Sequence, residues 1–172
     1  MAYNPETFAN KYEAALNRIA SLYQRTIDSG AGVNQLLVAI GNIDFKDLIE
    51  NELGFNRELN SVAQSYVDAL RDMDGFADVD ESVLRALVES DLNIYRSKFD
   101  DTYVQMKSLF TESVVNGLPR EAFVDALTKG QAGVLSPFQA KSLYTDSIAK
   151  FNRSVMKQMA ENAPANTMFI YT

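Results

Sequence analysis

Hydrophobic residues in the first 28 positions recur every three or four residues, which is the spacing of one face of an α-helix. Asn4 is placed to cap the start of this helix, Pro5 occupies its first position, and the glycines at 30 and 32 end the pattern after Asp28. The sequence therefore predicts a long amphipathic helix over 5–28. Its apolar stripe consists of Phe8, Tyr12, Ala15, Ile19, Leu22, Tyr23 and Ile27.

The same pattern predicts further helices along most of the chain. Shorter helices are expected over 34–40, 44–53, 57–71 and 119–129, separated by glycines. A last long helix begins at Pro137, with Ser136 as its N-cap, and Pro164 stops it. Its apolar stripe consists of Phe138, Leu143, Tyr144, Ile148, Phe151, Val155 and Met159.

The longest predicted helix, over 80–116, carries an eleven-residue repeat. Eleven residues complete three helical turns with little drift, so the repeat keeps its apolar residues on one nearly straight line. A helix of roughly 37 residues is about 55 Å long at about 1.5 Å per residue. We expect this line to pack on neighbouring helices or on other subunits, and we predict it as an interface. It consists of Leu84, Val88, Leu92, Tyr95, Phe99, Tyr103, Met106, Phe110 and Val114.

The last six residues, 167–172, have the β-branched and aromatic composition of a β-strand. In a chain that is otherwise helical, a lone strand has unpaired backbone groups. We therefore expect a neighbouring subunit, or sequence beyond this chain, to complete it, with Phe169 and Tyr171 on one face as further interface residues.

These elements together predict an all-α protein, an elongated bundle of about six or seven helices with a short C-terminal strand. Two regions are expected, an N-terminal helical region over 1–75 and a region over 80–172 that contains the long helix, the last helix and the strand. The two regions can pack as one domain.

The composition narrows the possible functions. The chain has no cysteine and no histidine, which excludes disulfides, thiolate zinc sites and histidine-based catalysis. No basic and apolar leader and no long apolar run is present, so the protein is expected to be made in the cytoplasm and to have no membrane partner. We expect a protein that is not an enzyme and has no cofactor.

The net charge of −7 argues against nucleic acid as a partner, because phosphate binding needs a concentrated basic face. The net negative charge lies mostly in the first half, where residues 1–79 hold 6 basic and 12 acidic side chains. The last helix is locally basic through Lys141, Lys150, Arg153 and Lys157. Such residues also complement the negative end of a helix, which is the interpretation that we favour.

An acidic turn precedes the long helix and partly fits a calcium-binding loop around Gly75. The candidate metal ligands are Asp72, Asp74, Asp78 and Glu81, but Leu70 occupies the position of the first ligand. The alternative to a calcium-responsive regulator or adaptor is an exposed turn whose carboxylates favour the N-terminus of the following helix. An enzyme that uses carboxylates alone is a third hypothesis.

The segment 135–155 (LSPFQAKSLYTDSIAKFNRSV), followed by Phe169-Ile170-Tyr171-Thr172, resembles the minor capsid or head-morphogenesis proteins of tailed phages, the Mu F-like group. The resemblance covers the C-terminal part only, and the segment that follows the aromatic strand in that family is absent here. It implies a virion location near the portal vertex. It also implies several copies per assembly, in contact with portal, capsid or neck subunits.

Overall fold

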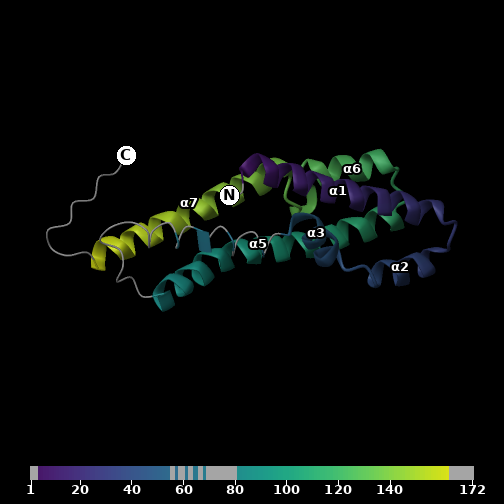
Figure 1. The fold of residues 1–172 in the computed structure, drawn as a ribbon. Coiled ribbons are helices and arrows are strands. Elements are labelled where there is room, and N and C mark those ends of the chain that lie inside the picture. The colour runs from purple at the N-terminus through teal and green to yellow at the C-terminus, as the bar shows by residue number, and fades with distance from the viewer. Residues whose placement is uncertain are drawn as a thin grey trace.

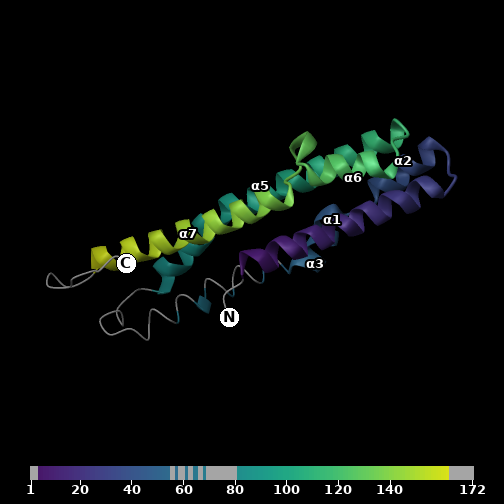
Figure 2. The same ribbon diagram turned by 90° about the horizontal axis from the view of Figure 1, so that it is seen from above.

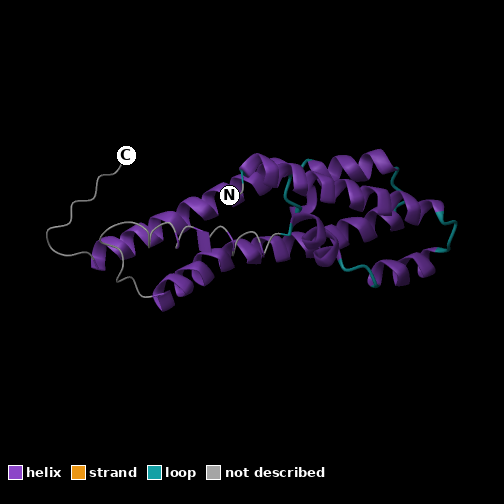
Figure 3. Cartoon of the chain, in the orientation of Figure 1, coloured by secondary structure: helices purple, strands orange, loops and turns teal. Residues whose placement is uncertain are grey.

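The computed structural model describes residues 4–54, 81–162 and five residues between these ranges. All regular structure in this part of the chain is helical, which confirms the predicted all-α class (Figure 3). The predicted helix 57–71, apart from those five residues, and the predicted strand 167–172 lie outside the described residues. The elements are α1 (Pro5–Asp28), α2 (Val33–Gly41), α3 (Phe45–Leu53), α5 (Glu81–Val115), α6 (Arg120–Thr128), the 3-10 turn η1 (Gln131–Gly133) and α7 (Pro137–Asn162).

Local capping residues fix where these helices begin, as the sequence predicts. The Asn4 side chain accepts a hydrogen bond from the backbone N–H of Glu6 at 2.9 Å at the start of α1. At the start of α7, Ser136 and Gln139 form a reciprocal capping box: the Gln139 N–H donates to Ser136 Oγ at 3.2 Å, and the Ser136 N–H donates to Gln139 Oε1 at 2.8 Å. Each cap satisfies backbone donors that the first helical turn leaves unpaired.

The helices form an elongated bundle around α5 (Figures 1 and 2). Helices α1 and α5 run in the same direction, and α7 runs back antiparallel to both. Helix α1 packs against α7, α3 and α6, and α5 packs against α7, α2, α3 and α6. A single hydrophobic core contains residues from both predicted regions, so the described parts of 1–75 and 80–172 pack as one body.

An eleven-residue register joins α1 to α5. Tyr12 and Tyr23 are eleven residues apart on α1, and Phe99 and Phe110 are eleven residues apart on α5. The Tyr12 ring meets the Phe99 ring edge-on at 5.8 Å, and the Tyr23 ring meets the Phe110 ring edge-on at 5.3 Å. Because both helices return to the same face after eleven residues and run in the same direction, one contact geometry repeats three turns later.

Each of these two contacts is the centre of an aromatic cluster. In the first, Phe8 of α1 stacks on Tyr144 of α7 at 4.7 Å and meets Phe99 edge-on at 6.1 Å. Tyr95, one turn before Phe99 on α5, stacks on the Phe99 ring at 4.9 Å. This cluster therefore ties α1, α5 and α7 together, and each aromatic pair contributes about 0.5–1.5 kcal/mol beyond the burial of its area.

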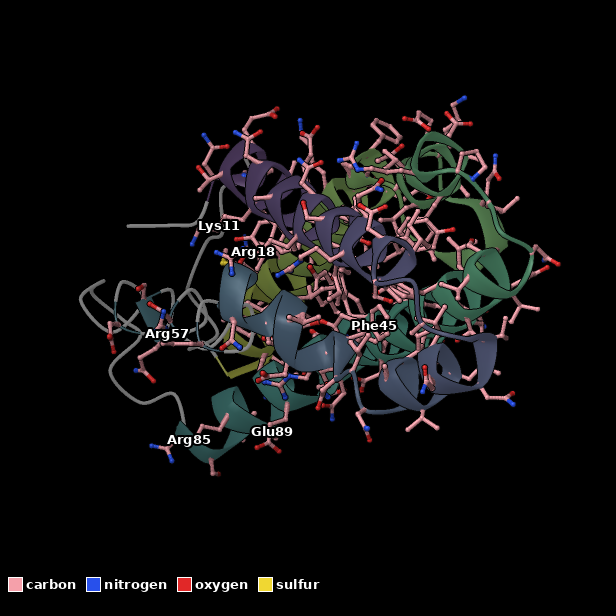
Figure 4. The ribbon with its side chains drawn as sticks, turned by 90° about the vertical axis from the view of Figure 1, so that its right-hand side faces the viewer. Lys11, Arg18, Phe45, Arg57, Arg85 and Glu89 are labelled. Carbon is pink, nitrogen blue, oxygen red and sulfur yellow. The ribbon has the colours of Figure 1, made fainter. Side chains whose placement is uncertain are left out.

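The second cluster adds α6 and α3 to the same two helices. Tyr23 stacks on Phe123 of α6 at 4.1 Å, and Phe123 meets Phe110 edge-on at 5.5 Å. Phe45, the first residue of α3, meets Phe110 from another side at 5.5 Å and lies inside the bundle in Figure 4. All four of these rings are buried.

The hydroxyl groups of the α1 tyrosines hold the two segments that flank α6. The Tyr23 hydroxyl donates to the Leu118 carbonyl, before α6, at 2.6 Å, and the Tyr12 hydroxyl donates to the Leu135 carbonyl, after η1, at 2.7 Å. Both backbone acceptors lie in connections between helices, where no regular hydrogen-bond ladder would satisfy them. The position of α1 on α5 thus also fixes the segments through which the chain passes from α5 to α7.

We predict that Phe99→Asp unfolds the protein or destabilises it by at least about 4 kcal/mol, because it buries a carboxylate among aromatic rings. Phe99 is 1% exposed. Urea unfolding followed by circular dichroism measures the change. The matched control is Ile94→Asp on the same helix, which is 54% exposed and should change stability by less than about 0.5 kcal/mol. Equal losses in the two variants would contradict this account of the core.

We also predict that stability falls steeply above about pH 10, the ordinary pKa of tyrosine. Burial raises the pKa of Tyr12, Tyr95 and Tyr103 well above that value. The unfolded chain therefore loses these protons first, and stability that is fully present below about pH 10 is lost as the pH rises, by up to about 1.4 kcal/mol per unit for each tyrosine. Melting temperatures from pH 8 to pH 12 test this, and Tyr12→Phe should make the fall shallower.

Candidate interaction surface

Helix α2 carries apolar side chains on its exposed side as well as on the side that packs against the core. The whole segment 29–43 contains none of the charged residues of the chain, although Asp28 and Asp44 flank it directly. Ile40 is its one buried residue, and Leu36 is partly buried against the core. Val33 is 50% exposed and Val38 is 68% exposed, so α2 presents apolar side chains to solvent on its outer side.

Helix α2 lies beside the C-terminal half of α5 (Figure 1). The Lys107 ammonium of α5 donates to the Gly41 carbonyl at 2.9 Å and so satisfies a backbone acceptor at the end of α2. Nearby, Lys46 of α3 forms an ion pair with Asp100 of α5 at 2.8 Å, and the hydrogen bond to this carboxylate raises the pKa of the lysine. Both lysines therefore fix α2 and α3 against α5.

An open hollow of about 440 Å³ lies where the α2–α3 connection meets α5. Its lining includes Gly41, Ile43 and Phe45 on one side and Tyr103, Val104 and Lys107 on the other. A second hollow of about 450 Å³ continues along the outer face of α5 and shares Val104 and Lys107 with the first. The two hollows are joined through these shared residues, and we call them, together with the exposed side of α2, the α2–α5 surface.

Six of the nine predicted interface residues of α5 belong to the core of the chain itself. They are at most 6% exposed, so at these positions the line packs on neighbouring helices of the same chain, which is one of the two alternatives that the sequence left open. The continuous helix α5, at about 52 Å, agrees with the predicted length. The six residues are Tyr95, Phe99, Tyr103, Met106, Phe110 and Val114.

The other predicted site residues cannot be placed. The side chains of Leu84, Val88 and Leu92 lie outside the described residues, as do Phe169 and Tyr171. Of the candidate calcium ligands, Asp72, Asp74 and Asp78 lie outside them, and Glu81 is described only as the first residue of α5. Within the described ranges, no three acidic side chains gather where they could hold a metal ion.

Sequence reasoning missed the α2–α5 surface although two signals for it were present. The first is the run of fifteen uncharged residues over 29–43, which contains four large aliphatic residues within five positions, 36–40. The second is Val104 and Val115 of α5, which repeat at the same eleven-residue spacing as the core residues but on the opposite side. They are 64% and 52% exposed.

One buried carboxylate lies away from this surface, between α5 and α7. Asp91 has a side chain that is 7% exposed, and its Oδ1 atom accepts an ion pair from Lys150 of α7 at 3.3 Å. Its Oδ2 atom is buried and has no hydrogen-bond partner among the residues that the structure describes. This ion pair links α5 to α7.

Comparisons with protein-family models, with curated proteins and with solved structures give no match to this chain. None of the helices in the described part is both long enough and apolar enough to cross a membrane. The α2–α5 surface is thus interpreted from its own geometry, together with the resemblance of the C-terminal segment.

We predict that Lys150→Met destabilises the protein by about 1–3 kcal/mol, because it leaves the Asp91 carboxylate buried without a cation. Adding Asp91→Leu should restore much of the loss, since the charge is then removed as well. The control is Lys157→Met, whose ion pair with Glu161 on the same helix is exposed and should matter by less than about 0.5 kcal/mol. Chemical unfolding of the four proteins tests this, and an unchanged Lys150→Met variant would contradict it.

Proposed function

We propose that this protein is a non-enzymatic structural component of a phage virion, a minor capsid or head–neck protein near the portal vertex that acts through protein–protein contacts. The observation that carries the proposal is the exposed apolar side of α2. Val33, Leu37 and Val38 are 36–68% exposed, so each loses part of the about 1.5–3 kcal/mol that full burial of such a side chain contributes. Contiguous apolar surface on a folded protein is typical of an interaction site.

The absence of charge on α2 supports a protein partner in particular. Cores of protein interfaces are depleted in charged residues, and a helix that presents apolar side chains can lie in a groove of another protein. The chain as a whole carries a net charge of −7, and a nucleic acid would be repelled by it. A partner that docks on 33–38 meets only apolar and uncharged side chains.

The choice of a virion partner rests on the resemblance of 135–155 to the head-morphogenesis proteins. In the structure this segment includes the capping box at Ser136 and the stacked Tyr144, so it forms part of the scaffold that positions α1 and α5. The α2–α5 surface lies toward the other end of the bundle from the C-terminal end of α7 (Figure 1). A protein of this shape can contact a virion neighbour through α2 while the end of α7 remains accessible.

The proposal is tested by co-expressing the protein with the portal and major capsid proteins of its own genome and counting its copies in purified particles. We expect wild type to be incorporated, and the double variant Leu37→Glu with Val38→Glu to be incorporated at least tenfold less. Both replaced side chains are exposed, so circular dichroism should show an unchanged fold. The control Ile94→Glu, an equally exposed aliphatic residue, should be incorporated like wild type. Particles without the wild-type protein would overturn the virion role.

A further inference from the structure

We infer that Phe138, at the corner where the chain turns from η1 into α7, is an aromatic anchor that inserts into an apolar pocket of another protein. Phe138 is 77% exposed, more than any other large hydrophobic side chain that the structure describes. The turn between α6 and α7 projects from one side of the bundle in Figure 2. This surface is separate from α2, and the inference takes the class of its partner, a virion protein, from the proposed function.

Helical periodicity explains why α7 does not bury Phe138 in its own bundle. Tyr144, Phe151 and Val155 are buried on the side of α7 that packs against α1 and α5. Phe138 precedes Tyr144 by six residues, which at 3.6 residues per turn places it about a third of a turn away from that side. The predicted apolar stripe of α7 is therefore wrong at Phe138, whose ring lies in solvent.

Several contacts hold the backbone of this corner in one conformation. Phe138 lies between Ser136 and Gln139, the two residues of the capping box at the start of α7. The Leu135 carbonyl, just before the box, accepts the hydrogen bond from the Tyr12 hydroxyl at 2.7 Å. A side chain that is presented by a fixed backbone loses less conformational entropy when it binds, which favours affinity.

The turn that precedes the corner has a strained backbone. Ala132 has a φ of +53°, in the left-handed region that residues other than glycine rarely adopt. The turn is also tightly packed, because a Cβ atom at Gly130 would lie 2.5 Å from Gln139 Oε1 and one at Gly133 would lie 3.1 Å from Gln105 Cγ. Strain that the surrounding structure maintains is common where a protein binds a partner. It therefore supports a binding role for the corner independently of the exposure of Phe138.

The chemistry of the corner fits an uncharged, apolar pocket of a protein. The segment 130–140 contains no charged residue. Lys129 and Lys141, which flank it, each form an ion pair with a carboxylate of the same chain. A nucleic acid or an anionic membrane would require available cations at this place. An aromatic anchor beside uncharged polar side chains, here Gln131 and Gln139, is typical of the centre of a protein interface.

The chain contains no tryptophan, so the variant Phe138→Trp carries a single fluorescent reporter at the proposed contact. Its emission should shift to shorter wavelength, and its quenching by acrylamide should fall, when the purified portal, major capsid or neck protein of the same genome binds. Wild type mixed with the same partner corrects for tryptophan in that partner. Val38→Trp, in a parallel experiment, reports on the contact at α2.

Binding measurements with the same partner test the energetic role of the ring. Phe138→Ala should raise the dissociation constant at least about tenfold, as expected of an aromatic anchor. The matched control is Ile94→Ala, an exposed aliphatic residue of α5, which should leave the dissociation constant unchanged. Circular dichroism should show the same helix content in both variants, since neither side chain is buried.

The other outcomes overturn the inference and separate it from the virion role. A spectral shift in Val38→Trp without one in Phe138→Trp would leave the proposed function standing and remove the anchor. Incorporation of wild type into particles without a shift in Phe138→Trp would have the same meaning. A shift of Phe138→Trp with vesicles of phosphatidylglycerol and phosphatidylcholine, or with rising concentration of the protein alone, would replace the partner protein by a lipid surface or a second copy.

Discussion

Two aromatic contacts between α1 and α5, eleven residues apart on each helix, connect the described helices of this structure. Two parallel helices normally drift out of register, but residues eleven apart return to nearly the same face on both. The edge-on contact of Tyr12 with Phe99 is therefore repeated by Tyr23 with Phe110. Every other described helix packs on this pair: α7 at the first contact, α6 and α3 at the second, and α2 beside α5.

The register also explains why tyrosine occupies both α1 positions. A phenylalanine would fill the same space, but its ring would leave the Leu118 and Leu135 carbonyls without the donors that now satisfy them. A fully buried carbonyl without a partner costs about 1–3 kcal/mol, and these two carbonyls are partly buried. The two tyrosines thus couple the packing of α1 on α5 to the position of α6. Through the same two hydrogen bonds they help to set the path of the chain from α5 to α7.

The helices could be predicted from the sequence because their signals are local: the caps at Asn4 and Ser136, the left-handed Gly54, and the apolar periodicity of α5. The partner of the α5 repeat could not. A repeat shows that one side of a helix is buried, but the residues that cover it, such as Phe8 and Tyr23, lie more than seventy positions away. The α2–α5 surface was missed because a periodic pattern identifies only the side of a helix that is buried. It does not predict apolar residues on the exposed side.

The apolar residues left over are informative because of where they lie. Four buried rings form the core at the second aromatic cluster, whereas the outer valines of α5 and α2 are at least half exposed. A sequence that needed only solubility would place charges there, as it does at Asp100 and Asp101, one turn before Val104. Uncharged side chains persist on both α2 and α5 in a protein with a net charge of −7. This contrast is the physical argument behind the proposal that another protein covers the exposed side of α2.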